Sequence, residues 1–319
     1  MRHKRSISAY GAGFKRKQIV HKVILAAIIL ILISLLPVIY FKTKGRSGNE
    51  RGELRDSFES GRYEEAYFQS RELLKEKPMD FFLLTIHGFS SYQLAIAQIN
   101  NFDMLSYVDN CIWSLRKALL LREGASDGRI FYVLGKAYYY KGSGYADLAV
   151  KYLEKARSAL YKAPDIPEYL GLAYASMRDY RSSVAAFSLA LTGEDDHYPG
   201  YNPSDILLIS IARSYLALDE FEPAKAYLYR CLDANRDSNT IATARLLLGN
   251  TYIKTGNFTE AEAEYIKVIE ENGDNAEAHF QLGELYALEG DPTRARAEWR
   301  RAFRIDPAFE PARKRLNMQ

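Results

Sequence analysis

The side chains that could support acid–base or metal chemistry are few and lie far apart along the chain. Carboxylates stand beside an imidazole in one place, the run Glu194-Asp195-Asp196-His197. A metal site needs more ligands than this in a fixed geometry, and the Pro, Gly and Asn that follow the run indicate a solvated turn. The histidines are scattered, at His3, His21, His87, His197 and His279. No base and nucleophile pair can be proposed, so we expect no enzymatic activity, no metal and no cofactor.

The two cysteines, Cys111 and Cys231, are about 120 residues apart and match no disulfide framework or metal-ligand spacing. Each stands beside an aliphatic residue, Ile112 or Leu232, on what the pattern predicts to be a helix face. We expect both thiols to be small buried hydrophobic groups.

The charge is divided unevenly between the N-terminus and the rest of the chain. Ten of the 43 basic residues lie in residues 1–46, which hold no Asp or Glu, so 33 basic residues face 40 acidic ones in the remainder. A nucleic-acid interface would need a basic face on the body of the protein. The composition therefore argues against a nucleic-acid partner.

An uncharged run of 19 residues, VILAAIILILISLLPVIYF, occupies 23–41 and is long enough to cross the hydrocarbon core of a bilayer. The run ends in Tyr40 and Phe41 without the small residues of a signal-peptidase site, although a buried core helix remains an alternative. We predict a basic cytoplasmic tail at 1–18, a transmembrane anchor at 19–41 and a linker at 42–49.

The flanking charges bear on the orientation of this span. Seven Lys or Arg precede it, and five follow within 15 residues. This small bias favours the N-terminus inside, which would place the remainder outside the cytoplasm, in the periplasm if the source is bacterial. We therefore expect a single-pass protein of the cytoplasmic membrane.

A 34-residue pattern recurs in the second half of the chain. Each unit has an apolar residue next to a small one, and an aromatic residue follows three positions later. Further along the unit come a second small residue, a large residue and a last apolar residue. The clearest unit starts at Ala276 and closes at Pro307, with Leu282, Gly283, Tyr286, Ala295, Trp299 and Ala302 at these places. The unit before it has Leu248, Gly249, Tyr252, Ala261, Tyr265 and Val268. This pattern resembles the tetratricopeptide repeat, a helix–turn–helix unit.

The resemblance implies an all-α fold, a right-handed superhelical solenoid of helix–turn–helix repeats preceded by one transmembrane helix. The small residues would let paired helices approach closely while the large ones fill the gaps. We expect two degenerate repeats at 50–127, five repeats at 128–163, 164–204, 205–241, 242–275 and 276–307, and a C-terminal capping helix at 308–319.

In this family the first helix of each repeat lines a concave groove, at positions two, five, nine and twelve or thirteen. Aromatic anchors with a few polar groups would suit an extended or helical peptide. The alternative is that these aromatic residues pack between repeats. The candidate peptide-binding residues are Phe89, Tyr92, Tyr132, Lys136, Tyr139, Tyr140, Arg213, Asn250, Lys254, Phe280 and Glu284.

The resemblance implies a non-catalytic scaffold that binds a peptide or a partner protein. A membrane-anchored bacterial envelope type, acting in envelope protein assembly or maintenance, is the first hypothesis. The alternatives are a structural envelope component that forms homo-oligomers, and an organelle import receptor with cytosolic repeats.

Overall fold

The computed structural model describes residues 50–98, 100–121, 123–192, 207–234 and 237–316, and within them the secondary structure is entirely helical. The chain divides into two compact units at Pro78. Within the described part, no helix combines the length and the apolar character needed to cross a bilayer. The predicted tail, span and linker, residues 1–49, lie outside the described residues.

The first unit is a helical hairpin in its described part. A helix at 50–59 is followed by a turn with Gly61 at φ +75° and then by α2 (Tyr63–Glu76). The turn brings the rings of Phe58 and Tyr63 to 5.6 Å between centroids, in an edge-on arrangement. The Arg62 guanidinium donates to the Ser57 hydroxyl across the same turn.

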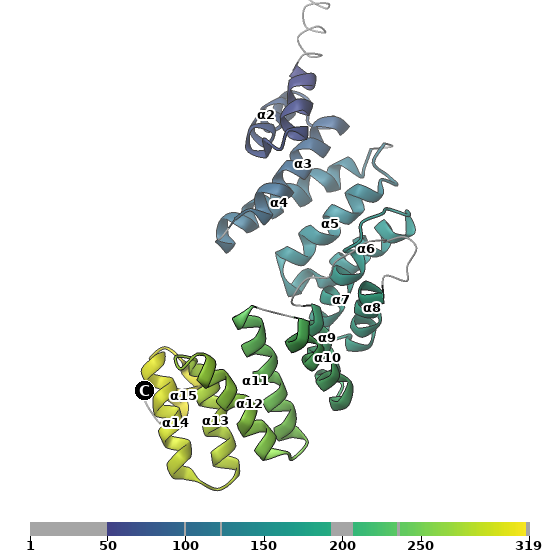
Figure 1. The fold of residues 1–319 in the computed structure, drawn as a ribbon. Coiled ribbons are helices and arrows are strands. Elements are labelled where there is room, and N and C mark those ends of the chain that lie inside the picture. Colours follow the sequence, from purple (N-terminus) through teal and green to yellow (C-terminus); the bar gives the residue numbers. More distant parts are fainter. Residues whose placement is uncertain (1–49, 99, 122, 193–206, 235–236, 317–319) are drawn as a thin grey trace, which may run out of the picture. The chain divides into compact units, whose positions relative to one another are not determined.

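The second unit is a series of helix pairs followed by one short helix (Figure 1). The first helices are α3 (Phe81–Ile96), α5 (Gly128–Lys141), α7 (Ile166–Ser176), α9 (Leu207–Ala217), α11 (Ser238–Lys254) and α13 (Ala276–Leu288). The second helices are α4 (Asn101–Ala118), α6 (Ala146–Ser158), α8 (Tyr180–Thr192), α10 (Phe221–Ala234), α12 (Phe258–Glu271) and α14 (Pro292–Ile305). A 3-10 turn, η1 (Ser143–Tyr145), joins α5 to α6, and α15 (Glu310–Arg315) follows α14.

Side-chain caps fix where several of these helices begin. The carboxylates of Asp127 and Asp291 and the amide oxygen of Asn275 accept hydrogen bonds from backbone N–H groups of the first turns of α5, α14 and α13. Such caps satisfy donors that have no partner within the helix. Helix α11 starts at Ser238, capped by Asp237, one turn ahead of the sequence position at which its repeat was expected to begin.

The small residue at the eighth position of a repeat is packed against a large residue of the paired helix, as the sequence pattern predicted. A Cβ added at any of these glycines would lie 2.4–2.6 Å from the facing side chain. Backbone and side chain are therefore in contact, which explains why only a small residue is accommodated. The facing pairs are Gly88 with Leu115, Gly135 with Leu153, Gly171 with Phe187, Gly249 with Tyr265 and Gly283 with Trp299.

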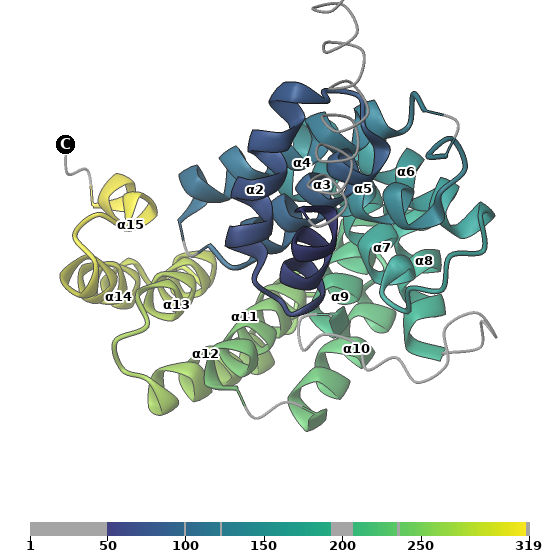
Figure 2. The same ribbon diagram turned by 90° about the horizontal axis from the view of Figure 1, so that it is seen from above.

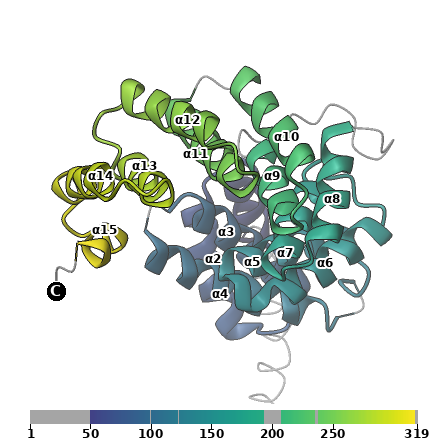
Figure 3. The same ribbon diagram turned by 90° about the horizontal axis from the view of Figure 1, so that it is seen from below.

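The first helices lie on the inner side of the second unit. Each contacts the first helix of the next pair, so that α3, α5, α7, α9, α11 and α13 form a continuous row. Figure 3 shows α6, α8, α10 and α12 outside α5, α7, α9 and α11. Hydrophobic clusters bridge successive pairs and give the unit a divided core that extends along the row. The fold is therefore solenoid-like, and its inner face is built from the helices expected to carry a binding groove.

Candidate functional site

Five tyrosines from three consecutive inner helices gather into one group, here called the tyrosine cluster. Its members are Tyr92 on α3, Tyr132, Tyr139 and Tyr140 on α5, and Tyr169 on α7. The Tyr139 and Tyr169 rings meet edge-on with centroids 5.4 Å apart. The Tyr140 and Tyr169 hydroxyls are 2.9 Å apart and share a hydrogen bond. The sequence pattern had identified all of these residues except Tyr169.

A largely buried ion pair lies inside the tyrosine cluster. The Lys136 ammonium is 2.7 Å from the Asp165 carboxylate and 3.0 Å from the Tyr132 hydroxyl, which in turn donates to the same carboxylate. The ammonium also lies 4.2 Å from the centroid of the Tyr169 ring, within range of a cation–π interaction. The cation is therefore compensated within the protein, and it ties α5 to the start of α7.

Burial favours the protonated form of four of the cluster hydroxyls. It raises the pKa of Tyr92, Tyr132, Tyr139 and Tyr169 above the ordinary tyrosine value, and the Asp165 carboxylate raises that of Tyr132 further. At neutral pH these groups are neutral hydrogen-bond donors and acceptors. Tyr139, Tyr140 and Tyr169 are only half-buried, so parts of their rings remain available at the inner surface.

Two of the expected groove residues near α3 are core residues. Phe89 and Tyr92 are 8% and 5% exposed. The Arg129 guanidinium lies 4.3 Å from the centre of the Phe89 ring. These two rings serve mainly to pack α3 against α5, which is the alternative that the sequence left open for the aromatic residues.

Further along the row, the inner face becomes basic and more open. Arg213 on α9 and Lys254 on α11 are both exposed. Asn250, one turn before Lys254, is partly buried, and its amide oxygen accepts a hydrogen bond of 2.6 Å from the hydroxyl of the buried Tyr265. The amide oxygen of Asn250 therefore has a structural partner, whereas Arg213 and Lys254 remain candidates for contact with a ligand.

The last two expected groove residues are contacted by the C-terminal helix. The rings of Phe280 on α13 and Phe309, which precedes α15, lie 5.5 Å apart. The Arg315 guanidinium forms a bidentate ion pair with the Glu284 carboxylate. At this end the inner face of α13 is occupied by the chain itself.

Sequence reasoning missed Asp165 and Tyr169. Asp165 stands at position two of its repeat, a groove position by the same pattern, so its signal was present in the sequence. Tyr169 stands at position six, which the pattern does not assign to the groove. It was missed because α7 is oriented so that this ring reaches α5.

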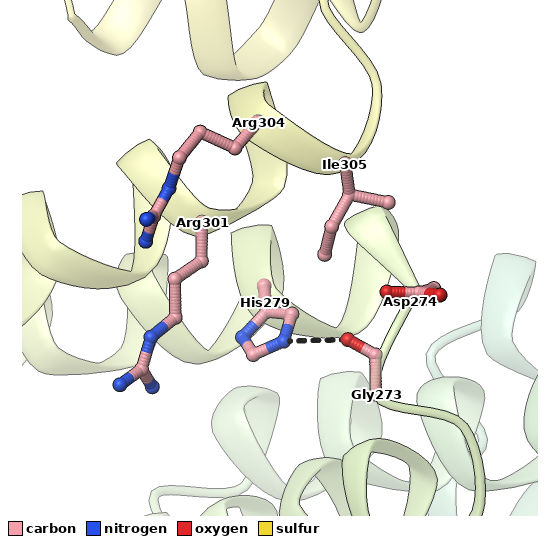
Figure 4. A pocket seen from close by; sticks show the side chains of 6 residues that line it. All are labelled: Gly273, Asp274, His279, Arg301, Arg304 and Ile305. Atoms are coloured by element: carbon pink, nitrogen blue, oxygen red, sulfur yellow. Dashed lines mark hydrogen bonds between the residues drawn. The ribbon is translucent and has the colours of Figure 1, made fainter.

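An open pocket of about 780 Å³ lies at the other end of the array, between the α12–α13 loop and α14 (Figure 4). Its lining residues are Gly273, Asp274, His279, Arg301, Arg304 and Ile305. The His279 ring is buried, with Nδ1 2.7 Å from the Glu298 carboxylate and Nε2 3.2 Å from the Gly273 carbonyl oxygen. Both ring nitrogens are thus engaged by protein atoms, so the imidazole is not free to act as a base in this pocket.

The pairing behind this pocket occurs at the same positions in the preceding repeat. There the Arg245 guanidinium lies 3.0 Å from the buried Glu264 carboxylate. Lys267, one turn after Glu264 on the same helix, forms a second ion pair with this carboxylate. In the last repeat His279, Glu298 and Arg301 take these places. The recurrence indicates a device that ties the two helices of a repeat together, which argues against a ligand site.

Both cysteines are buried and neither forms a disulfide, as the sequence predicted, and burial raises the pKa of the Cys111 thiol. In the part of the chain that the structure describes, no three His, Cys, Asp or Glu side chains gather closely enough to hold a metal ion. The acidic run at 194–197 lies outside that part.

Comparison with known proteins identifies the repeats. Models of the tetratricopeptide repeat match residues 207–238 and 246–308. The anaphase-promoting complex subunit CDC16 of Saccharomyces cerevisiae is 30% identical over 159 residues, which are 48% of this chain but only 18% of that subunit. The chain therefore matches less than a fifth of the length of this relative.

Solved structures show the same fold at low sequence identity. The C-terminal part of a tetratricopeptide protein from Cytophaga hutchinsonii has a TM-score of 0.58 at 15% identity, covering 84% of this chain and all of that one. PilW, a type IV pilus biogenesis factor, has a TM-score of 0.56 at 19% identity, covering 72% of this chain and 98% of that one. Tetratricopeptide proteins are generally non-catalytic protein–protein interaction scaffolds, and repeat solenoids present extended concave binding surfaces. The chain thus contains tetratricopeptide repeats, arranged in an all-helical, solenoid-like fold.

Proposed function

We propose that this protein is a membrane-anchored scaffold that binds an extended peptide or a segment of a partner protein along its inner helices. The observation that carries the proposal is the surface formed by Tyr139, Tyr140 and Tyr169, half-exposed on adjacent inner helices. Tyrosine offers contact area with little side-chain entropy to lose, together with a hydroxyl for a backbone group.

The charge along the row supports an extended ligand. Lys136 is neutralised by Asp165, so this pair adds little net charge to the tyrosine surface. Arg213 and Lys254 follow on α9 and α11 and are exposed. A segment with apolar or aromatic residues followed by acidic ones would match this order of side chains.

Replacing Tyr139 and Arg213 together with alanine should weaken partner capture by about tenfold or more, the effect expected when an aromatic anchor and a charged anchor are lost. The amount of each partner captured from detergent-solubilised native membranes is measured by quantitative mass spectrometry. Circular dichroism should show unchanged helicity, because neither side chain is in the core.

A matched double variant on the outer helix α10, Tyr229→Ala with Arg230→Ala, removes the same residue types from exposed positions. It should leave capture unchanged. Equal loss of capture in both double variants, or in neither, would assign binding to another surface.

The proposed anchor is residues 19–41, with the N-terminus in the cytoplasm and the repeats outside it. The length and lack of charge of the run at 23–41 support the span, and the excess of preceding basic residues supports this orientation. A role in envelope protein assembly or maintenance follows if the source is bacterial.

Anchorage and orientation can be measured together in cells that express the chain with a C-terminal tag. The full chain should stay with the membrane in alkaline carbonate, and a chain lacking residues 1–41 should be released. In spheroplasts with an intact inner membrane, added protease should remove the tag. If the tag is degraded only after the inner membrane is lysed, the orientation is the opposite of the one proposed and the repeats are cytosolic.

A further inference from the structure

The outer side of α4 carries an exposed apolar stripe. Phe102, Leu105 and Trp113 lie within about 80° of one another around the helix axis, and Leu120 follows just beyond the end of the helix. Their exposed fractions are 84%, 38%, 49% and 77% in chain order. The stripe is about 27 Å long at the rise of an α-helix. These four residues are called the outer stripe below.

None of the later outer helices that the structure describes has a comparable surface. Each of α8, α10 and α12 exposes one large hydrophobic residue, namely Leu189, Tyr229 and Ile266. Helix α6 has one exposed at each end, Tyr145 and Leu160, and none within it. Single exposed hydrophobic residues are normal on soluble proteins, whereas a row of them marks an interaction surface. The outer stripe therefore requires an explanation that the other outer helices do not.

The polar groups around the stripe suit a surface between water and lipid. The Lys117 ammonium lies 3.9 Å from the centre of the Trp113 ring, and Arg116 is exposed beside it. Asp109 is the acidic residue within the stripe, and the Lys141 ammonium neutralises it at 2.5 Å. Tryptophan flanked by basic residues is typical of helices that lie in the headgroup region of a bilayer.

The form of the surface distinguishes between possible occupants. Helix α4 packs on α3 and α5 (Figure 2). Asp109 and Arg116, on the same face as the stripe, reach Lys141 and Tyr138 of α5, so the exposed stripe runs along the edge of that contact. The stripe follows one helix and forms no groove that could hold a peptide. A lipid surface needs no groove and can cover the exposed side chains of one helix. Four partly exposed side chains supply on the order of 500 Å² of apolar surface, less than the roughly 800 Å² that each partner buries in a stable protein dimer.

We infer that the outer stripe of α4 lies in the headgroup region of the lipid bilayer that holds the anchor. The inference rests on the anchorage in the proposed function. The predicted span is separated from the described chain by residues 42–49, which reach about 28 Å even when extended. The described chain therefore begins within about 28 Å of the predicted lipid surface.

Trp113 is a built-in reporter of this contact, because the chain has two tryptophans and the other, Trp299, is 8% exposed. The full chain is reconstituted into phosphatidylcholine and phosphatidylglycerol vesicles whose phosphatidylcholine is brominated along the acyl chains. Bromine quenches tryptophan only at short range. We expect brominated lipid to remove most of the Trp113 emission and aqueous acrylamide to remove little of it, with Trp113→Phe supplying the background from Trp299.

Two matched pairs of substitutions test whether the stripe is responsible. Phe102→Ser with Leu105→Ser should restore quenching of Trp113 by acrylamide and abolish quenching by brominated lipid. Leu189→Ser with Ile266→Ser, on other outer helices, should change neither. All substituted side chains are exposed, so the helical fold should be retained.

The inference is overturned if Trp113 in the reconstituted chain is quenched by acrylamide and not by brominated lipid. It is also overturned if Trp113 is shielded from both quenchers, because the stripe would then be covered by protein, and shielding that depends on protein density would identify a second copy. Carbonate extraction reports on the anchor and partner capture on the inner face, so failure of either is distinguishable from failure of the stripe.

Discussion

Substitution of Tyr265 by alanine should lower the free energy of unfolding of the C-terminal repeats by about 3–5 kcal/mol, as for other large aromatic residues in protein cores. The Tyr265 side chain is fully buried, and its ring lies directly against Gly249. Its removal leaves a cavity at the centre of a repeat and takes a hydrogen-bond donor away from Asn250. Because each repeat packs mainly on its neighbours, the loss should be concentrated in α11 to α14.

Amide hydrogen exchange in increasing urea locates and measures this loss. In the Tyr265→Ala variant, protection should fall in α11 to α14 at lower urea concentration than in α3 to α8. Tyr265→Phe is the matched control, since it keeps the ring and removes only the hydroxyl, and about 1 kcal/mol is expected for the lost hydrogen bond. Equal losses in the two variants would contradict the packing described for this repeat.

Substitution of Asp165 by alanine should destabilise the α5–α7 region by about 3 kcal/mol, the low end of the range for removing one partner of a buried ion pair. The Lys136 side chain is 11% exposed and would be left among the tyrosine rings without its carboxylate. Combining Lys136→Met with Asp165→Ala removes both charges and should recover much of the loss. A double-mutant cycle measured by urea denaturation gives the coupling between the two residues.

The exposed pair of Asp109 and Lys141 provides the comparison for this experiment. The Asp109 side chain is 61% exposed, so Asp109→Ala should cost less than about 1 kcal/mol. If Asp165→Ala costs no more than Asp109→Ala, the ion pair inside the tyrosine cluster does not fasten α5 to α7.

Much of the architecture was predictable because packing within a tetratricopeptide repeat is local in sequence. The contact of Gly283 with Trp299 joins residues 16 positions apart, and the same offset joins Gly249 to Tyr265. A fixed offset leaves a fixed pattern in the sequence, so the helix pairs could be identified from residue types alone. The start of α11 at Ser238 could not, because it depends on a cap at Asp237 that lies outside the repeated positions.

The candidate site was predictable only in part. The positions of Tyr132, Lys136 and Tyr139 within the repeat were enough to place them on one helix. Those positions could not show that Asp165 would neutralise the lysine. They also could not show that α15 would contact Phe280 and Glu284, because a capping helix has no repeat pattern of its own. Contacts between repeats depend on the angle between neighbouring pairs, which residue types at fixed positions do not encode.

Site-specific photocrosslinking in native membranes tests most directly whether the inner helices bind the partner. A photoreactive amino acid is placed at Tyr139 on the inner helix α5 or at the exposed Lys151 on the outer helix α6. The proposed function predicts a discrete crosslinked species from position 139 that is absent from position 151 and reduced by Arg213→Ala. The same species from both positions, or from position 151 alone, would contradict a binding site on the inner face.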